Sequence, residues 1–251
     1  MDLTAFVTAQ FLGVAAIFAR IGTVFLFMPG FGERSIPVRH RLALALVMCI
    51  ALSPALPVGP LELSGLAAIL ALLGTEATLG LWLGMTARIL MNALNFAGYQ
   101  IGMTSGLANA LAPSMGAFEG ATLVASTLML AGTTLIFATD LHHVIVGAMV
   151  MSYDIFPLGG IMPGDMARQI VRAAGMSFYV GVSIAAPFYV MGLVLNVGLG
   201  LANRLMPTLP VFFVAMPVLL ASGLLVMTMA LPSMLSGFLT VFADWLGLLT
   251  F

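Results

Sequence analysis

This sequence has no lysine, a single cysteine and few charged side chains. Its eight basic residues are all arginine, charged residues make up 7% of the 251, and the net charge is −1. No broad basic surface therefore suggests nucleic acid or anionic lipid as a partner. The lone Cys49 excludes an internal disulfide and argues against a cysteine-based metal site. We expect neither a cofactor nor a bound metal.

Apolar sequence is what the chain has in abundance. Hydrophobic residues make up 62% of it and the mean hydropathy is +1.17, whereas charged residues alone are about a quarter of an ordinary soluble protein. This composition predicts an all-α integral membrane protein. At about 20 residues per crossing, the length accommodates about six or seven apolar segments and no separate globular domain. We therefore expect one membrane-embedded domain over residues 1–251.

Six long apolar runs are the candidate helices, at residues 4–28, 42–56, 65–94, 121–150, 171–201 and 209–249. The last two are long enough to be kinked, tilted or subdivided. Strict alternation would put the arginine-containing links at 29–41 and 152–172 on opposite sides, so the positive-inside rule leaves the orientation open. A partial segment would explain the conflict, and so would a protein that does not sit in the bilayer as an ordinary spanning bundle.

Residues 185–223 are apolar enough for a bilayer but are interrupted by four prolines and by the polar side chains of Asn196, Asn203 and Arg204. Hydrocarbon contains no hydrogen-bond donors or acceptors, so other helices or a wet cavity must supply the partners. This favours a polytopic or multi-subunit device over an anchor.

Glycine recurs at helical spacing in the segment AGYQIGMTSG, as Gly98, Gly102 and Gly106. On a helix this spacing puts three bare backbone patches on one face, which predicts close packing against another helix. Gly80 and Gly84 form a further pair at the same spacing. For that pair, close packing and the general frequency of glycine in membrane helices stay open as explanations.

The following segment, SGLANALAPSMGAFEG, is weakly apolar and lies between two long apolar runs. It has the composition of a loop at membrane depth. Irregular backbone is tolerated there only when it is buried in protein or lines a water-filled path, which makes this segment a candidate gate or plug. An ordinary surface connection is the alternative that the residues alone leave open.

Glu76 and Arg88 lie twelve residues apart in one apolar run, on roughly one helical face but too far apart to touch. Each needs an external partner or a wet surface, unless it snorkels to the interface, which the long stem of Arg88 permits. Arg20 in the first run poses the same choice between snorkelling and burial.

Asp140, His142 and His143 form the one cluster of acid and histidine, in FATDLHHVIVG. Adjacent histidines point about 100° apart on a helix, and no HExxH spacing exists, so polar residues at a helix margin account for the cluster better than a metal site. Phosphate-binding loops, GxSxG turns and paired catalytic acids are also absent from the sequence. We expect no enzymatic activity.

Five landmarks occur in order along nearly the whole chain: FARIGTVFLFMPGFGERSIPVRHRLALAL, GTEATLGLWLG, AGYQIGMTSG, FATDLHHVIVGAMVMSYDIFPLG and AAPFYVMGLVLNVGLGLANRLMP. In this order and spacing they resemble the FliR family of flagellar biosynthetic proteins, the FliR/SctT export-gate subunits of type III secretion. The resemblance implies a non-catalytic subunit of the gate through which unfolded flagellar proteins leave the cytoplasm.

The resemblance also implies partners and a location. One FliR-like chain closes a helical assembly with FliP-like and FliQ-like subunits, while FlhB-like and FlhA-like proteins work beside it. The assembly belongs to the bacterial inner membrane and the flagellar basal body. Its kinked helical hairpins form a conical stack largely above the bilayer plane, which would account for the split orientation.

The resemblance places family positions on this chain. Glu76, His142, His143, Arg204 and Pro207 match family motifs, and Arg88, Asp140 and Asn196 join them as polar or subunit-contact candidates. Ala112, Leu141, Thr208 and Pro210 depart from residues that the family often has. The family's plug loop falls on residues 105–118: Ser105, Gly106, Leu107, Ala108, Asn109, Ala110, Leu111, Ala112, Pro113, Ser114, Met115, Gly116, Ala117 and Phe118.

Three other functions stay in view. The homologous subunit of a virulence injectisome would share the mechanism and differ in its clients. A secondary transporter would use Glu76, Arg88 and Asp140 near the midplane, although the sequence shows no repeated halves. A membrane scaffold would give no change in permeability when the plug segment is altered.

Overall fold

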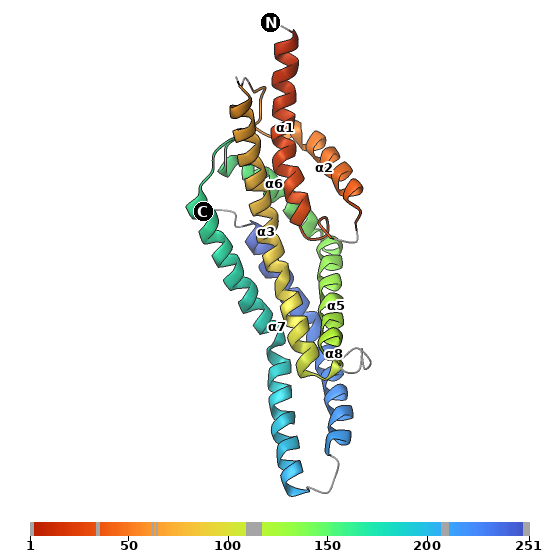
Figure 1. The fold of residues 1–251 in the computed structure, drawn as a ribbon. Helices are drawn as coiled ribbons and strands as arrows, with labels where there is room; N and C mark the ends of the chain where they lie inside the picture. The colour runs from red at the N-terminus through yellow and green to blue at the C-terminus, as the bar shows by residue number, and fades with distance from the viewer. Residues whose placement is uncertain are drawn as a thin grey trace. The chain divides into compact units, whose positions relative to one another are not determined.

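The computed structural model describes residues 3–33, 36–61, 63, 65–108, 117–206 and 211–247. Its regular elements in this part of the chain are all helical (Figure 1), and six helices are long and apolar enough to cross a membrane. The predicted all-α membrane fold is confirmed. In order, the elements are α1 (Leu3–Phe27), α2 (Val38–Leu52), the short 3-10 helix η1 (Ser53–Ala55), α3 (Leu66–Thr104), α5 (Ala117–Ala138), α6 (Leu141–Ile155), α7 (Pro163–Leu205) and α8 (Val211–Gly247).

The run predicted at 121–150 is wrong as a single helix. It is divided into α5 and α6 at Asp140, whose φ of 58° is the only positive φ among the described non-glycine residues. Aspartate tolerates this left-handed conformation better than most side chains. The apolar residues on both sides hid the break, because hydropathy does not record a single backbone reversal.

Prolines do not subdivide the two long C-terminal helices. Pro187 lies inside α7, and Pro217 and Pro232 lie inside α8. Each proline removes one backbone donor and crowds the preceding turn, yet the helix continues on both sides. Of the three possibilities that the sequence left open, kinking, tilting and subdivision, subdivision is not found, and α7 runs for 43 residues.

The structure divides into two compact units. Unit 1 contains Met1–Leu90, Ile136–Ala173 and Phe242–Phe251, and unit 2 contains Met91–Leu135 and Ala174–Val241. The sequence analysis expected one embedded domain over 1–251. In the structure, α3, α7 and α8 each contribute residues to both units.

In unit 1, α1 buries a stripe of side chains at spacings of three and four residues. Ala9, Leu12, Ala16, Val24 and Met28 follow this spacing, and the missing place between Ala16 and Val24 is occupied by Arg20. A helix that is apolar on all sides does not reveal from its sequence which stripe faces the core. The guanidinium of Arg20 is therefore carried into the core by its place in the helical repeat.

The neighbouring helix α2 is far less buried. It packs beside α1 in unit 1 (Figure 1), and it buries Ala45 and Cys49, one turn apart on one face. Cys49 is fully buried, in agreement with the expectation that it fills space. The remaining apolar side chains of α2, such as Val47 and Ile50, are exposed and leave the outer face of the helix for contacts outside the chain.

Candidate functional site

The two buried charged side chains of the described chain form an ion pair, between Arg20 of α1 and Glu76 of α3. The Arg20 Nε donates a hydrogen bond of 2.7 Å to Glu76 Oε2, and the two side chains are 1% and 0% exposed. With so little exposure to solvent, each charge needs its partner, because an unpaired buried charge is strongly destabilising. Arg20 is therefore buried rather than snorkelling, and it is the external partner that Glu76 needed.

Close contact between α1 and α3 brings the two charges together. A Cβ at Gly80 would overlap the Arg20 carbonyl, and a Cβ at Gly84 would lie 2.8 Å from the Val24 carbonyl oxygen. Only glycine lets the two backbones approach this closely. Gly80 lies one turn after Glu76, so the same contact sets the distance between the ionised groups. The pair Gly80 and Gly84, left open from sequence, is a packing pair.

The rest of the ion pair's hydrogen bonds go to the end of α6 and the turn that follows it. The Nη1 and Nη2 groups of Arg20 donate to the carbonyl oxygens of Ser152 and Phe156, each at 2.9 Å. The backbone N–H of Gly159, which has a φ of 74°, donates to Glu76 Oε1 at 2.9 Å. The Ser152 carbonyl oxygen also accepts from the Phe156 N–H at 3.0 Å, so Arg20 adds a second donor at this helix end. Arg20 and Glu76 thus satisfy a helix end and the turn into α7.

An aromatic ring closes this cluster. The Arg20 Cζ atom lies 4.0 Å from the centre of the Tyr153 ring, a cation–π contact. Trp82 packs edge-on against Phe156 and donates from Nε1 to the Met166 carbonyl oxygen at 3.0 Å. With every oxygen of Glu76 engaged inside the chain, its side chain has no free surface for a neighbouring subunit. The arrangement supports positioning rather than proton transfer.

Arg88 also finds a partner outside its own helix. Its Nη1 donates to Glu33 Oε1 at 2.9 Å, with side-chain exposures of 30% and 28%. Such partly solvated pairs contribute far less to stability than their geometry suggests. Of the two intramembrane candidates, Glu76 thus belongs to the core, and Arg88 belongs to a half-exposed link between α3 and the α1–α2 loop.

Gly98 and Gly102 face α5 within unit 2. A Cβ at Gly98 would overlap the backbone of Ala125, and one at Gly102 would lie 2.8 Å from the Ala121 Cα. Gly106 does not continue this helical face, because α3 ends at Thr104 and Gly106 has a φ of 70°. The three-glycine face predicted from spacing therefore ends after two members, and Gly106 begins the exit from the helix.

The structure describes the two ends of the candidate plug loop. Asn109, Ala110, Leu111, Ala112, Pro113, Ser114, Met115 and Gly116 lie outside the described residues, as do the side chains of Ala117 and Phe118.

The first end of the loop is tightly enclosed. Ser105, Leu107 and Ala108 are buried, and Ser105 Oγ donates to the Ile101 carbonyl oxygen at 2.6 Å. A Cβ at Gly120 would overlap the backbone of Ala108, and one at Gly223 of α8 would lie 2.7 Å from Ser105 Cβ. Ser105–Ala108 therefore form a stem that α5 and α8 enclose. A methyl group added at Gly120 or Gly223 would find no space.

The acid and histidine cluster lies at the start of α6. Possible ligand atoms of Asp140, His142 and His143 lie within 4.8 Å of one another. His142 stacks on Phe137 with ring centres 5.5 Å apart, and its Nδ1 is buried without a hydrogen-bond partner. The side chains of Asp140 and His143 are mostly exposed, and Asp140 Oδ1 lies 3.9 Å from His143 Nδ1. These three residues are the ones in the described chain that have the types and proximity to hold a metal.

Comparison with known proteins places these features in a family. Residues 11–245 match the family of bacterial export proteins, family 1. The flagellar biosynthetic protein FliR of Caulobacter vibrioides is 40% identical over 249 residues, which cover 96% of each chain. The chain belongs to this bacterial export family. FliR of Escherichia coli is 27% identical over 205 residues, covering 81% of this chain and 78% of that protein.

A translocation protein is also among the relatives of this chain. The Yop proteins translocation protein T of Yersinia pestis is 26% identical over 175 residues, covering 67% of this chain and 66% of that protein. The family resemblance drawn from the five landmarks is thereby confirmed.

The late motif of this export-family chain lies on the surface of α7. Asn196 and Arg204 are exposed, and Pro207 lies outside the described residues. Exposed polar side chains on so apolar a helix are available to partners outside the chain. In unit 2 they are therefore better placed for a subunit contact than Glu76 is in unit 1.

Sequence reasoning missed several positioning residues. Arg20 and Glu76 are 56 residues apart, and the glycines that hold the plug stem, Gly120 and Gly223, are 103 apart. No local periodicity links such positions. The available signal was an arginine in the first apolar run and a glutamate in the third, each of which required a partner that the sequence did not identify.

Proposed function

We propose that this protein is a subunit of a type III export gate, which forms with FliP-like and FliQ-like subunits a channel for unfolded flagellar proteins. The observation that carries the proposal is the 40% identity to a flagellar FliR over 96% of both chains. The proposed place of work is the bacterial inner membrane within the flagellar basal body, beside FlhB-like and FlhA-like proteins. The proposed role is that of a conduit without enzymatic activity.

The exposed surface supports an assembly of several subunits. Large apolar side chains are exposed along α2 and α7, and α7 also exposes Asn196 and Arg204. Lipid can cover the apolar side chains, but it cannot satisfy the polar ones. Neighbouring subunits would do both.

The plug loop is the proposed movable element. Its buried stem at Ser105–Ala108 anchors the loop within unit 2, and the weakly apolar residues of 105–118 would seal the path by excluding water and ions. Opening would then require displacement of a short loop rather than of a whole helix.

Deletion of residues 109–116 tests the seal. The deletion leaves the described stem intact, so the gate should assemble and leak ions in cells that express the complete apparatus. Proton leak measured with a membrane-potential dye checks this expectation, and Gly198→Ala on α7, where an added Cβ meets nothing within 4 Å, is the control. An assembled gate with unchanged leak would refute the plug role and support a scaffold.

Mass spectrometry of the complex recovered through a tag on this chain tests the function as a whole. FliP-like and FliQ-like subunits should be recovered in stable association from native membranes in mild detergent. Recovery as a lone monomer or homodimer would favour a secondary transporter. The injectisome alternative is weaker here, because the Yersinia pestis relative is 26% identical against 40% for the flagellar one.

A further inference from the structure

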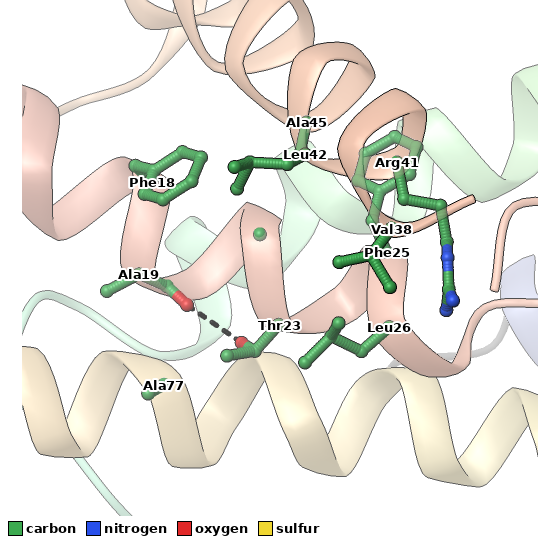
Figure 2. A pocket seen from close by; sticks show the side chains of 11 residues that line it. Phe18, Ala19, Thr23, Phe25, Leu26, Val38, Arg41, Leu42, Ala45 and Ala77 are labelled. Carbon is green, nitrogen blue, oxygen red and sulfur yellow. Dashed lines mark hydrogen bonds between the residues drawn. The ribbon is translucent and has the colours of Figure 1, made fainter.

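An apolar pocket opens in unit 1 between α1, α2 and one position of α3. Its volume is about 250 Å³, and its walls include Phe18, Phe25, Leu26, Val38, Leu42 and Ala77 (Figure 2). The Thr23 hydroxyl, which also faces the pocket, already donates to the Ala19 carbonyl oxygen at 2.8 Å. The walls therefore offer an occupant apolar contact and almost no hydrogen bonds.

One edge of this pocket carries an unsatisfied cation. Figure 2 shows the Arg41 guanidinium at the side opposite Phe18. The Arg41 Nε is buried and has no hydrogen-bond partner among the residues that the structure describes, and no acid is among the described residues that line the pocket. A buried donor without an acceptor costs free energy, and the cost is larger when the donor is charged. The described part of the chain therefore supplies no acceptor to the Arg41 Nε at this edge.

The start of α2 strengthens the demand for negative charge. Arg39, His40 and Arg41 all lie in its first turn, which contains no acid, and Pro37 supplies no side-chain cap. The N-terminal end of a helix carries partial positive charge, so these basic residues stand at its unfavourable end. Glu33, in the preceding loop, is already paired with Arg88 at 2.9 Å.

The geometry points to a binding site for an anionic phospholipid. One acyl chain occupies the pocket, and the headgroup phosphate accepts hydrogen bonds from Arg41 Nε and from the N–H groups of Val38 and Arg39, since those of His40 and Arg41 donate to the Pro37 carbonyl oxygen. An alkyl chain needs no polar partner, whereas an inserted stretch of protein backbone would find none in these walls. The net charge of −1 is no obstacle, because the cations are concentrated at one helix end.

Lipid retention by the purified, assembled complex tests the site. Native mass spectrometry with added phosphatidylglycerol or phosphatidylcholine should show a retained phosphatidylglycerol that Arg41→Gln weakens about tenfold, the loss of one charge-assisted contact. Arg172→Gln, at an exposed arginine of α7, is the matched control and should leave retention unchanged. Equal retention of both lipids, or no effect of Arg41→Gln, would overturn the proposal.

A second variant tests the apolar part without touching charge. Gly22 lines the pocket, and a Cβ there meets only the Phe18 ring at 3.5 Å, an ordinary contact. Gly22→Leu should fill the pocket and lower phosphatidylglycerol retention about tenfold, while Gly74→Leu, where a Cβ meets nothing within 4 Å, should not. Two results together would overturn the assignment: displacement of the lipid by inorganic phosphate alone, and unchanged lipid retention in Gly22→Leu. They would show an anion site that holds no acyl chain.

Photo-crosslinking identifies the occupant in native membranes. With Leu42→p-benzoylphenylalanine, irradiation should add the mass of a phospholipid to the chain. Crosslinks to a neighbouring subunit in place of lipid would show that protein fills the pocket, which would also overturn the proposal.

Discussion

The contacts inside unit 1 differ in kind from the contacts inside unit 2. Of all charged residues, only Glu119 and Arg204 fall in unit 2, whereas unit 1 contains the buried Arg20–Glu76 pair and the half-exposed Arg88–Glu33 pair. Glycine lets helices approach closely in both units, at Gly80 and Gly84 in unit 1 and at Gly98 and Gly102 in unit 2, but among the described residues the ion pairs lie in unit 1.

The two kinds of contact differ in how strongly they fix the relative orientation of the groups. Hydrogen bonds to a guanidinium and a carboxylate fix the angle as well as the distance between groups, and they weaken steeply when either changes. Contacts between small residues contain no such directional hydrogen bond and depend on how closely the two surfaces fit. Unit 1 thus has the character of a fixed joint. Unit 2, which holds the stem of the proposed plug, has no ion pair among its described residues and is stabilised by close packing.

Loss of the Arg20 charge should lower the stability of the protein more than any other change proposed here. Arg20→Met leaves Glu76 buried without its partner and removes the guanidinium donors from the Ser152 and Phe156 carbonyl oxygens, which should cost about 3–5 kcal/mol. The yield and thermal midpoint of the assembled complex measure this cost.

The matched control is Arg172→Met, at an exposed arginine that should tolerate the change. Adding Glu76→Leu to Arg20→Met removes the orphaned charge and should restore part of the lost stability. If Arg20→Met alone matched the wild type, the joint in unit 1 would not depend on charge.

Enlarging the glycine face of unit 2 should have the next largest effect. Gly102→Leu forces a side chain into the Ala121 backbone and should cost at least about 1–3 kcal/mol, with reduced assembly of the complex. Gly74→Leu on the same helix α3, where a Cβ meets nothing within 4 Å, provides the control. Equal yields of the two variants would argue against close packing at Gly102.

A single methyl group at the plug stem should have a smaller effect. A Cβ at Gly223 would lie 2.7 Å from Ser105 Cβ and 2.9 Å from its carbonyl oxygen, so Gly223→Ala should destabilise unit 2 by about 1 kcal/mol. Displacement of the stem should also raise ion leak through the assembled gate.

Gly237→Ala, on the same helix α8 and with nothing within 4 Å, sharpens this prediction. It should be neutral or stabilise by up to about 1 kcal/mol, because alanine is the better helix former. Opposite signs for the two alanine variants are the expected result, and the same sign would show that the Ser105 contact does not matter.

The half-exposed pair of unit 1 should matter least. Arg88→Gln should lower stability by about 0–1 kcal/mol, since solvent already screens the interaction with Glu33. The difference in thermal midpoint from the wild type should shrink as salt is added. A loss as large as that of Arg20→Met, or one independent of salt, would mean that the pair is drier than its exposure of 30% and 28% indicates.

Particular elements show how far sequence reasoning reaches. The apolar runs predicted the long helices, because length and hydropathy are properties of contiguous residues. The sequence did not predict the division between α5 and α6 at Asp140, because a single residue with a φ of 58° does not change the hydropathy. The glycine spacing identified Gly98 and Gly102 as a face but extended it to Gly106, since spacing does not record where a helix ends.

The sequence by itself determined that this is an all-α membrane protein of the export family and that Glu76 needs a partner, because composition, motif order and the cost of an unpaired charge are all legible along the chain. Only the tertiary structure decided that Arg20 is this partner and that Gly223 encloses Ser105. Both are contacts between helices distant in sequence. In a chain this uniformly apolar, no pattern marks which helical faces meet, so that choice belongs to three-dimensional packing.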